Sequence, residues 1–188
     1  MKLASANLPT KYGLFKILIY QSSAVLIMGN VKNPKPILVR IHSQCLTGDS
    51  FYSLRCDCGW QLQTSMKKIQ KAGRGIIIYL NQEGRGLGLT NKIKAYSLQD
   101  QGLDTVDANN ALGLPSDTRD YSLAADILKD LHITSINLLT NNPQKIDQLE
   151  KYGITVNKRI SLEVTPNKNN KKYLKTKKEK MGHNLNLV

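Results

Sequence analysis

Short apolar runs that suit β-strands recur in the first eighty residues and again after residue 134. Strands are usually four to eight residues long and rich in β-branched side chains, and these runs have both properties. Proline and asparagine at 33–36 predict a turn between two of them. The predicted strands lie within 8–20, where a turn comes first, and at 24–28, 37–41, 75–80, 135–140 and 154–160.

Apolar residues three or four positions apart predict helices between these strands. Gly73 and Gly153 suit helix ends, while Asn142 suits an N-cap with Pro143 as the first helical residue. Residues 102–119, rich in Asp, Asn and Gly, predict a loop. The predicted helices are 60–72, 91–101 with Ile93, Tyr96 and Leu98 apolar, one marked by Tyr121, Ala124, Ile127, Leu128 and Leu131, and one from Pro143 to about Tyr152.

Alternation of helices and strands predicts an α/β domain, and the early cluster of strands predicts a mixed sheet flanked by helices. A chain of 188 residues suits one domain. We expect a catalytic domain at 1–165 and a basic C-terminal segment at 166–188 that is loosely ordered in part. No apolar run approaches the ~18 residues of a membrane span, and no signal peptide is visible. The default expectation is a cytoplasmic protein with no membrane partner.

The formal net charge of +13 predicts an anionic partner. Nine Lys and Arg residues from Lys158 onward face only Glu163 and Glu179, so much of the excess lies at the end of the chain. These lysines form either a solvated tail or a field that steers an anionic substrate. A basic zinc-containing nucleic-acid-binding protein is one rival interpretation, but aromatic residues are only 6% and no Cys₄ or Cys₂His₂ finger is present.

Three cysteines lie within fourteen residues, at Cys45, Cys56 and Cys58. An odd number in so short a stretch does not suggest disulfides, and such clusters more often bind metal. Zinc usually takes four ligands, and a site that keeps one position open is typical of catalysis. Gly48 and Gly59 would give the loop turn freedom. His42 is an alternative fourth ligand, although an extended strand would point it away from Cys45; a third reading is three reduced core cysteines without metal.

Two further segments suit phosphate. The glycine-rich loop at 82–88 is neither a P-loop nor a dinucleotide fingerprint, but its glycines allow close approach and Arg85 can clamp a phosphate. The helix that follows Asn142 offers free N–H groups and a positive dipole end. Lys145 in its first turn opposes that dipole, which phosphate binding would explain; the alternative is a plain surface lysine.

Six motifs occur together and in order: RIHSQCLTGD, SLRCDCGWQL, LNQEGRGLGLTNKIKAYSLQDQGLDTVDANNALG, DTRDYSLAADIL, LLTNNPQK and KMGH. This set resembles the GTP cyclohydrolase II family, nearly continuously from Arg40 to Lys145 and again at 180–183. The single-domain form is the one it resembles. The resemblance implies hydrolysis of GTP to formate, pyrophosphate and a diamino-ribosylamino-pyrimidinone phosphate, the first step of riboflavin synthesis. It also implies a homodimer, one zinc ion per subunit, and magnesium with the triphosphate, with no specific nucleic-acid partner.

The resemblance also assigns residues. It implies Asp117 as proton acceptor, Arg119 as nucleophile and Tyr96 as an assisting group near the zinc. Arg119 is chemically awkward as a nucleophile because a guanidinium stays protonated, so a phosphate clamp is the plainer role. A core role for Tyr96 and a solvated carboxylate at Asp117 are the alternatives. The implied zinc ligands are Cys45, Cys56 and Cys58, and the implied GTP contacts are Arg40, Ile41, His42, Ser43, Gln44, Gln61, Glu83, Gly84, Arg85, Thr105, Thr140 and Lys145.

Gln44 departs from the family pattern, which usually has Glu at this position. The change removes a carboxylate beside the zinc strand and puts any acid–base role there in doubt. A second rival interpretation follows from it: a nucleotide-binding relative with impaired catalysis. The intact cysteines, Asp117 and Arg119 speak against that rival.

Overall fold

The computed structural model describes residues 2–21, 23–32 and 36–188. The turn predicted at 33–36 falls mostly outside these ranges. The chain divides into two compact units, and it passes between them several times. The first unit contains 1–42, 62–80 and 120–162, and the second contains 43–61, 81–119 and 163–188.

The first unit is built on one mixed sheet, as the sequence predicts. Its strand order is β1-β2-β3-β5-β4-β6-β7. Strands β1, β2, β3 and β5 pair antiparallel in that order. Strand β6 pairs parallel with both of its neighbours, β4 and β7. The strands are β1 (Ala4–Thr10), β2 (Gly13–Tyr20), β3 (Ser23–Met28), β4 (Ile37–Ser43), β5 (Gly75–Leu80), β6 (Ser135–Leu139) and β7 (Thr155–Ile160).

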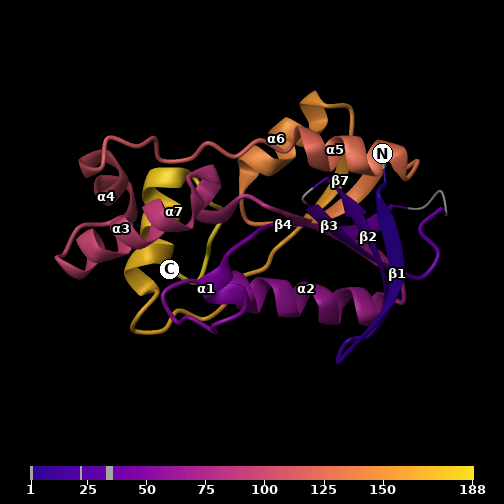
Figure 1. Cartoon of the computed structure of the whole chain (residues 1–188), viewed down its shortest axis with the longest axis horizontal. Helices are drawn as coiled ribbons and strands as arrows, with labels where there is room; N and C mark the ends of the chain where they lie inside the picture. Colours follow the sequence, from indigo (N-terminus) through magenta and orange to yellow (C-terminus); the bar gives the residue numbers. More distant parts are fainter. Residues whose placement is uncertain (1, 22, 33–35) are drawn as a thin grey trace. The chain divides into compact units, whose positions relative to one another are not determined.

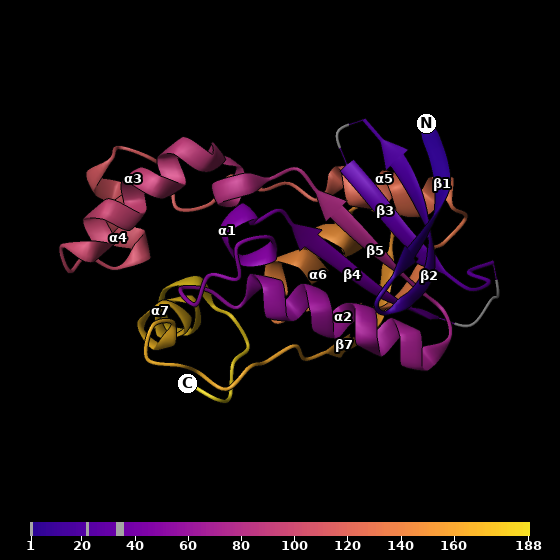
Figure 2. The same ribbon diagram turned by 60° about the horizontal axis from the view of Figure 1, so that its bottom comes forward.

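Helices cover both faces of this sheet (Figures 1 and 2). Side chains alternate between the faces of a strand, and β5 shows the consequence. Ile76 and Ile78 belong to the core cluster that contains Leu128 of α5 (Ser122–Asp130) and Leu149 of α6 (Pro143–Lys151). Ile77 belongs to the opposite cluster, with Ile69 of α2 (Cys58–Ala72). Because both faces are buried, the inner strands read as continuous apolar runs.

Parallel pairing of β4 with β6 decides where polar groups gather. Val39 pairs with Leu138, so the chain leaves both strands at the same edge of the sheet. The residues at that edge are 40–42, near the end of β4, and 140–142, which follow β6. Ligands of open α/β sheets usually bind outside the carboxyl ends of the strands. The topology therefore places two of the predicted binding segments beside each other within the first unit.

Strand β1 is missing from the sequence-based prediction, which gives residues 8–20 as a turn and one strand. The structure instead pairs Ala4–Thr10 with β2, and the turn lies at 11–12. All but two of the β1 residues are exposed. An exposed strand at the edge of a sheet has no apolar alternation to reveal it, which is why the pattern fails here.

The second unit is mainly helical and contains α1 (Leu46–Asp49), η1 (Glu83–Gly86), α3 (Gly88–Asp100), α4 (Thr105–Ala111) and α7 (Lys171–Met181). Helix α4 contradicts the loop predicted at 102–119. Its N-cap, Asp104, accepts hydrogen bonds from the backbone of Val106 and Asp107. The polar composition of the segment concealed a short helix that depends on capping rather than on an apolar face.

Helix α3 also differs from its prediction. It starts at Gly88 rather than 91, and Ala95 is its buried residue, whereas Ile93 is 48% exposed. The apolar face expected from Ile93, Tyr96 and Leu98 is therefore wrong. The N-terminus of α6 is as expected, since the Asn142 side chain accepts from Gln144 N and Pro143 opens the helix.

Within the C-terminal stretch 166–188, the structure has helix α7, where Leu174 is 2% exposed. The domain boundary at 165 and partial looseness beyond it stay predictions. Every helix in the described ranges is too short or too polar to cross a bilayer.

Candidate functional site

The three cysteines meet in the second unit. Their Sγ atoms all lie within 4.8 Å of one another, and Cys45 Sγ is 3.7 Å from Cys56 Sγ. A tetrahedral zinc with Zn–S bonds of about 2.3 Å would separate two sulfurs by about 3.8 Å. The sulfur spacing therefore fits a metal ion of this size. Cys45 and Cys56 are buried and Cys58 is partly buried.

Two glycines, Gly48 and Gly59, leave space beside the cysteine sulfurs and their backbone. A Cβ on Gly48 would lie 2.8 Å from Cys56 Sγ and 3.2 Å from Cys45 Sγ. A Cβ on Gly59 would lie 2.1 Å from the carbonyl oxygen of Gly48. Neither glycine has a positive φ. The prediction that they supply turn freedom is therefore wrong; they supply space for the sulfurs.

Lys92 is a component of this cluster that sequence reasoning missed. Its Nζ lies 3.2 Å from Cys45 Sγ and 2.8 Å from Glu83 Oε1. The Lys92 and Glu83 side chains are only 10% and 9% exposed. Glu83 Oε2 in turn accepts from the backbone N–H of Leu46, the residue after Cys45. Lys92 lies four residues before Tyr96 on the same helix face, a spacing that could have revealed it.

Hydrogen bonds among the three cysteines shift the pKa values of their thiols in opposite directions. Thiols of Cys56 and Cys58 donate to Cys45, and Lys92 adds its charge, so the pKa of Cys45 is lowered strongly. The bond to Cys45 raises the pKa of Cys56 to about 11, and the same interaction raises that of Cys58. These contacts favour the thiolate at Cys45, whereas Cys56 and Cys58 must lose protons to bind metal.

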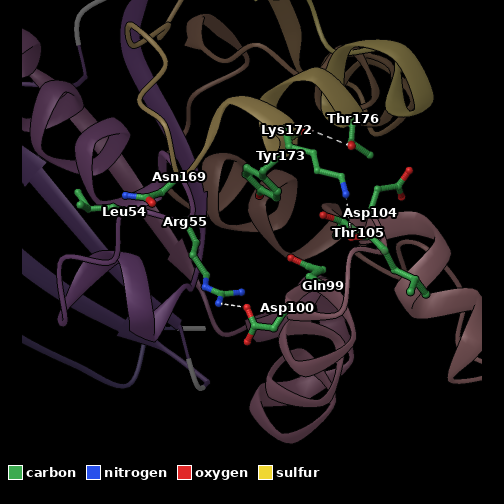
Figure 3. A pocket seen from close by; sticks show the side chains of 11 residues that line it. Leu54, Arg55, Gln99, Asp100, Asp104, Thr105, Asn169, Lys172, Tyr173 and Thr176 are labelled. Atoms are coloured by element: carbon green, nitrogen blue, oxygen red, sulfur yellow. Dashed lines mark hydrogen bonds and ion pairs between the residues drawn. The ribbon is translucent and has the colours of Figure 1, made fainter.

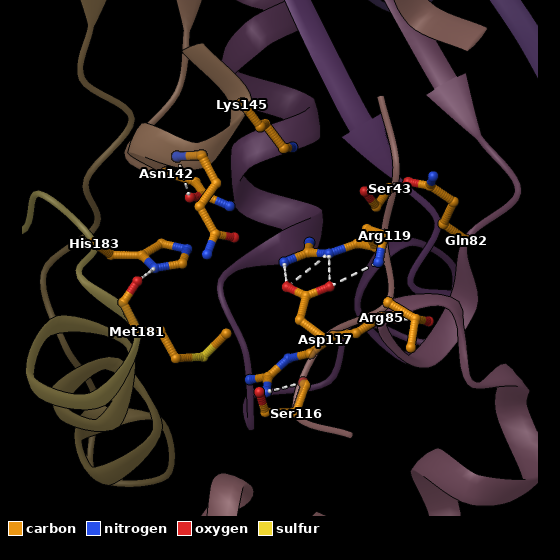
Figure 4. A network of polar contacts seen from close by, with 12 residues as sticks. Ser43, Gln82, Arg85, Ser116, Asp117, Arg119, Asn142, Lys145, Met181 and His183 are labelled. Atoms are coloured by element: carbon orange, nitrogen blue, oxygen red, sulfur yellow. Dashed lines mark hydrogen bonds and ion pairs between the residues drawn. The ribbon is translucent and has the colours of Figure 1, made fainter. Parts of the chain in front are cut away.

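Asp117 and Arg119 form a compact ion pair (Figure 4). Arg119 Nε and Nη2 both donate to the Asp117 carboxylate, at 2.9 Å to Oδ1 and 2.5 Å to Oδ2. Burial acts to raise the pKa of Asp117, but the hydrogen bonds and charge of Arg119, with a contribution from Arg85, lower it overall. The carboxylate is therefore ionised and orients the guanidinium, so it is not a solvated loop residue.

Arg85, within the glycine-rich loop at 82–88, has a left-handed backbone conformation with φ 62°. Such a conformation is uncommon for a residue with a Cβ and persists only where the surroundings hold it. Thr118 holds it in place, since its N–H and Oγ1 both donate to the Arg85 carbonyl. A Cβ at Gly86 would lie 2.4 Å from Thr118 Oγ1, so this position requires glycine. Arg85 Nη1 donates to Ser116 O, and Nη2 is buried without a partner among the described residues (Figure 4).

Tyr96 lies close to the cysteine loop within the second unit. Its hydroxyl is 3.4 Å from Thr47 Oγ1, and the Arg55 guanidinium lies 4.9 Å from its ring centroid. Burial raises the pKa of Tyr96, so the phenol stays protonated at neutral pH and can donate. Gln61, at the start of α2, donates to the buried Asp57 carboxylate in the same loop.

In the first unit, the predicted binding residues gather at the carboxyl edge of β4 and β6. Arg40 Nη1 donates to Leu139 O at 2.9 Å, and His42 stacks on Tyr79. Lys145 Nζ donates to the backbone oxygen of Ile41 at 2.7 Å.

Lys145 is only 4% exposed, so its interpretation as a plain surface lysine is wrong. Thr140 is 1% exposed, and its Oγ1 accepts from the backbone N–H of Asn142. Asn142 Nδ2 is a buried donor with no partner in the part of the chain that the structure describes. A buried donor of this kind costs about 1–3 kcal/mol when unpaired, so a bound acceptor would stabilise it.

Thr105 lines a pocket of about 400 Å³ within the second unit (Figure 3). Both signs of charge line this pocket, including Arg55, Lys172 and Asp104. No cysteine lines it, so its volume says nothing about the metal cluster. Of the remaining predicted contacts, Ser43 donates to Gln82, Gln44 is half-buried, and Gly84 donates its N–H to Glu83 Oε1.

Comparisons with known proteins agree on one family. The model described as GTP cyclohydrolase II matches residues 1–161. A GTP cyclohydrolase-2 of Histophilus somni (strain 2336) is 50% identical over 96% of this chain and 87% of its own. A riboflavin biosynthesis protein RibBA of Endomicrobium trichonymphae is 53% identical over 100% of this chain and 48% of its own, so this chain spans about half of that relative. A crystal structure of RibBX, a two-domain 3,4-dihydroxy-2-butanone 4-phosphate synthase from A. baumannii, aligns at TM-score 0.43 and 17% identity over 87% of this chain and 40% of that one, too low to carry an argument.

Proposed function

This chain belongs to the GTP cyclohydrolase II family, and on that premise we propose that it hydrolyses GTP to formate, pyrophosphate and 2,5-diamino-6-(5-phosphoribosylamino)pyrimidin-4(3H)-one. The observation that carries the proposal is the trio of sulfurs at metal-binding distance, with glycine beneath them. Zinc held there by three thiolates, with its fourth position open, would supply an activated water for an electron-poor ring carbon. Magnesium would accompany the triphosphate.

Lys92 would offset a drawback of a metal site with three thiolate ligands, which is weak acidification of the bound water. Three thiolates donate much electron density, which lessens the acidifying effect of the metal on a bound water. A lysine ammonium 3.2 Å from Cys45 Sγ withdraws some of that density and balances the negative charge of the thiolates. Glu83 holds Lys92 in this position and also fixes the backbone beside Cys45. These two residues would therefore tune the metal site.

Asp117 and Arg119 would act on the phosphates. A carboxylate whose pKa is below its ordinary value is a poor base, and a guanidinium has a pKa above about 12. Asp117 therefore suits orientation of Arg119 better than removal of its proton. We propose that Arg119 clamps the α-phosphate and stabilises charge as pyrophosphate leaves. Arg85 Nη2 is a further buried donor for a phosphate oxygen.

The edge of β4 and β6 would supply additional contacts. Lys145 is a buried cation, and Asn142 Nδ2 is an unsatisfied donor at the N-terminus of α6. Helix N-termini and buried cations both favour anions. Thr140, Arg40 and His42 stand on the same edge, and the remaining predicted contacts keep the roles that the family implies. A homodimer and a cytoplasmic location complete the proposal.

The test is incubation of the purified protein with GTP and Mg²⁺, followed by assays of formate, pyrophosphate and the pyrimidine product. Cys56→Ser should abolish formate release, because two thiolates cannot hold the metal. Ser50→Ala is the matched control, since Ser50 is an exposed residue of the same loop and should keep full activity. A wild-type protein that leaves GTP intact while binding DNA with a steep salt dependence would refute the proposal in favour of a nucleic-acid-binding role.

Arg119→Lys tests the phosphate role. Lysine keeps the charge but loses the planar fork, so turnover should fall by at least about a hundredfold. Mass spectrometry of acid-quenched protein distinguishes the two roles of Arg119. A guanylyl adduct on the wild-type chain would show that Arg119 is a nucleophile, and the clamp proposed here would then be wrong.

A further inference from the structure

The loop that carries two of the three sulfurs is held by a lysine of the C-terminal helix. Lys177 Nζ lies 2.8 Å from Asp57 Oδ1, and the two side chains are only 12% and 2% exposed. Asp57 stands between Cys56 and Cys58 in the chain. The carboxylate that Lys177 contacts therefore belongs to the residue joined directly to both cysteines.

The other groups around this ion pair are also satisfied. Gln61 Nε2 donates to Asp57 Oδ2 at 2.5 Å, so both carboxylate oxygens have partners. The Lys177 ammonium lies 4.5 Å from the ring centroid of Tyr173, one helical turn earlier on α7. A buried ion pair with its remaining hydrogen bonds made is costly to break from one side, because the other charge stays buried alone.

Helix α7 is itself anchored within the second unit. Lys180 Nζ lies 2.5 Å from Asp104 Oδ2, and Asp104 is the N-cap of α4. Lys172 donates to the backbone oxygen of Gly102 (Figure 3 shows the Lys172 side chain beside Asp104). Leu174 and Thr176 are buried. Lys177 is thus presented by a fixed helix, unlike Lys175, which is 64% exposed in a surface pair with Glu179.

We propose that Lys177 is a positioning residue of the metal site, and that α7 acts through it to fix the Cys56–Cys58 segment. This inference rests on the proposed function in one respect, since it assumes that the three sulfurs hold a metal ion. Without the lysine, the Cys56–Cys58 segment would lose its tether to α7, and the Asp57 carboxylate would be a buried charge without its partner. Among the many lysines near the C-terminus, Lys177 would then have a specific role at the metal site.

The experiment compares Lys177→Met, which keeps the length of the side chain, with Lys177→Arg and with Lys175→Met as the matched control on the same helix. Zinc affinity is measured on the full chain by chelator competition without GTP. Cobalt replaces zinc in a second measurement, because the ligand-field absorption of Co²⁺ reports the geometry of its sulfur ligands. Thermal midpoints of the metal-free proteins record any general loss of stability.

Lys177→Met should weaken zinc binding by at least about tenfold, equivalent to about 1.4 kcal/mol. At saturating cobalt its absorption should differ from that of the wild type, which a merely structural role would not cause. Lys177→Arg should restore both values to within about threefold, because charge and hydrogen bonding remain. Lys175→Met should match the wild type.

Wild-type affinity and an unchanged cobalt spectrum in Lys177→Met would overturn the inference, as would equal losses in Lys177→Met and Lys175→Met. If Lys177→Met does not fold, the double variant Asp57→Asn with Lys177→Met tests the positioning role instead, because it leaves neither charge buried without its partner. It should fold and bind zinc weakly, and tight binding would refute the inference. A wild type that binds zinc but releases no formate would refute the proposed function alone.

Discussion

Replacing Gly48 by alanine is the sharpest perturbation of the metal site, because it adds one methyl group beneath the sulfurs. The new Cβ would lie 2.8 Å from Cys56 Sγ, 3.1 Å from Cys58 Cβ and 3.2 Å from Cys45 Sγ. Non-bonded carbon atoms settle at about 3.5–4.0 Å, so the closest sulfur must retreat by roughly 0.7–1.2 Å. Metal–ligand distances tolerate only about 0.2 Å.

The effect depends on whether metal is bound. Without metal, Cys56 Sγ can rotate away, and alanine gains about 0.5–1 kcal/mol over glycine in a helix such as α1. With metal, the sulfur cannot rotate without losing the bond, and overpacking of this kind costs about 1–3 kcal/mol. We therefore expect zinc affinity to fall roughly 5- to 140-fold, while the stability of the metal-free protein changes little.

The assay is zinc binding by chelator competition, with urea unfolding of the metal-free protein beside it. Gly113→Ala is the control, since Gly113 has φ +67° and an added Cβ would meet nothing within 4 Å. That change should lower stability by about 1–2 kcal/mol and leave zinc affinity unaltered. Wild-type zinc affinity in Gly48→Ala would refute the reasoning, because the sulfurs would then have room that the structure denies them.

Three further predictions concern the polar network. Lys92→Met should lower the free energy of unfolding by roughly 3 kcal/mol because it leaves the buried Glu83 carboxylate without its opposite charge, and adding Glu83→Gln should recover most of the loss in urea unfolding. Because Arg119 lowers the pKa of folded Asp117 below the ordinary value near 4, this pair should stabilise the protein fully above about pH 5. The advantage over Asp117→Asn should begin to decline near pH 4 and be lost as pH falls through the lowered folded-state pKa; thermal midpoints across pH check this sign. Lys145→Met should keep or raise stability but increase the KM for GTP at least about tenfold, and an unchanged KM would show that this lysine is not a substrate contact.

Much of the fold follows from local patterns. The strands at 37–41, 75–80 and 135–140 are apolar because both sheet faces are covered, and runs of this kind are visible in any chain. The start of α6 was equally predictable, since the capping side chain and the following proline act within a few residues. Strand β1 and helix α4 were missed because neither has an apolar face to display.

The cysteine spacing and the order of the motifs, read in the sequence, predicted a metal site and a family. The charged side chains that surround the site could not be predicted, because their contacts join residues that are distant in the chain. Lys92 reaches Cys45 across 47 positions and Lys177 reaches Asp57 across 120. Burial then gives these contacts their strength, since a charge removed from water needs its partner, and only the folded chain decides which charges are removed from water and what lies opposite them.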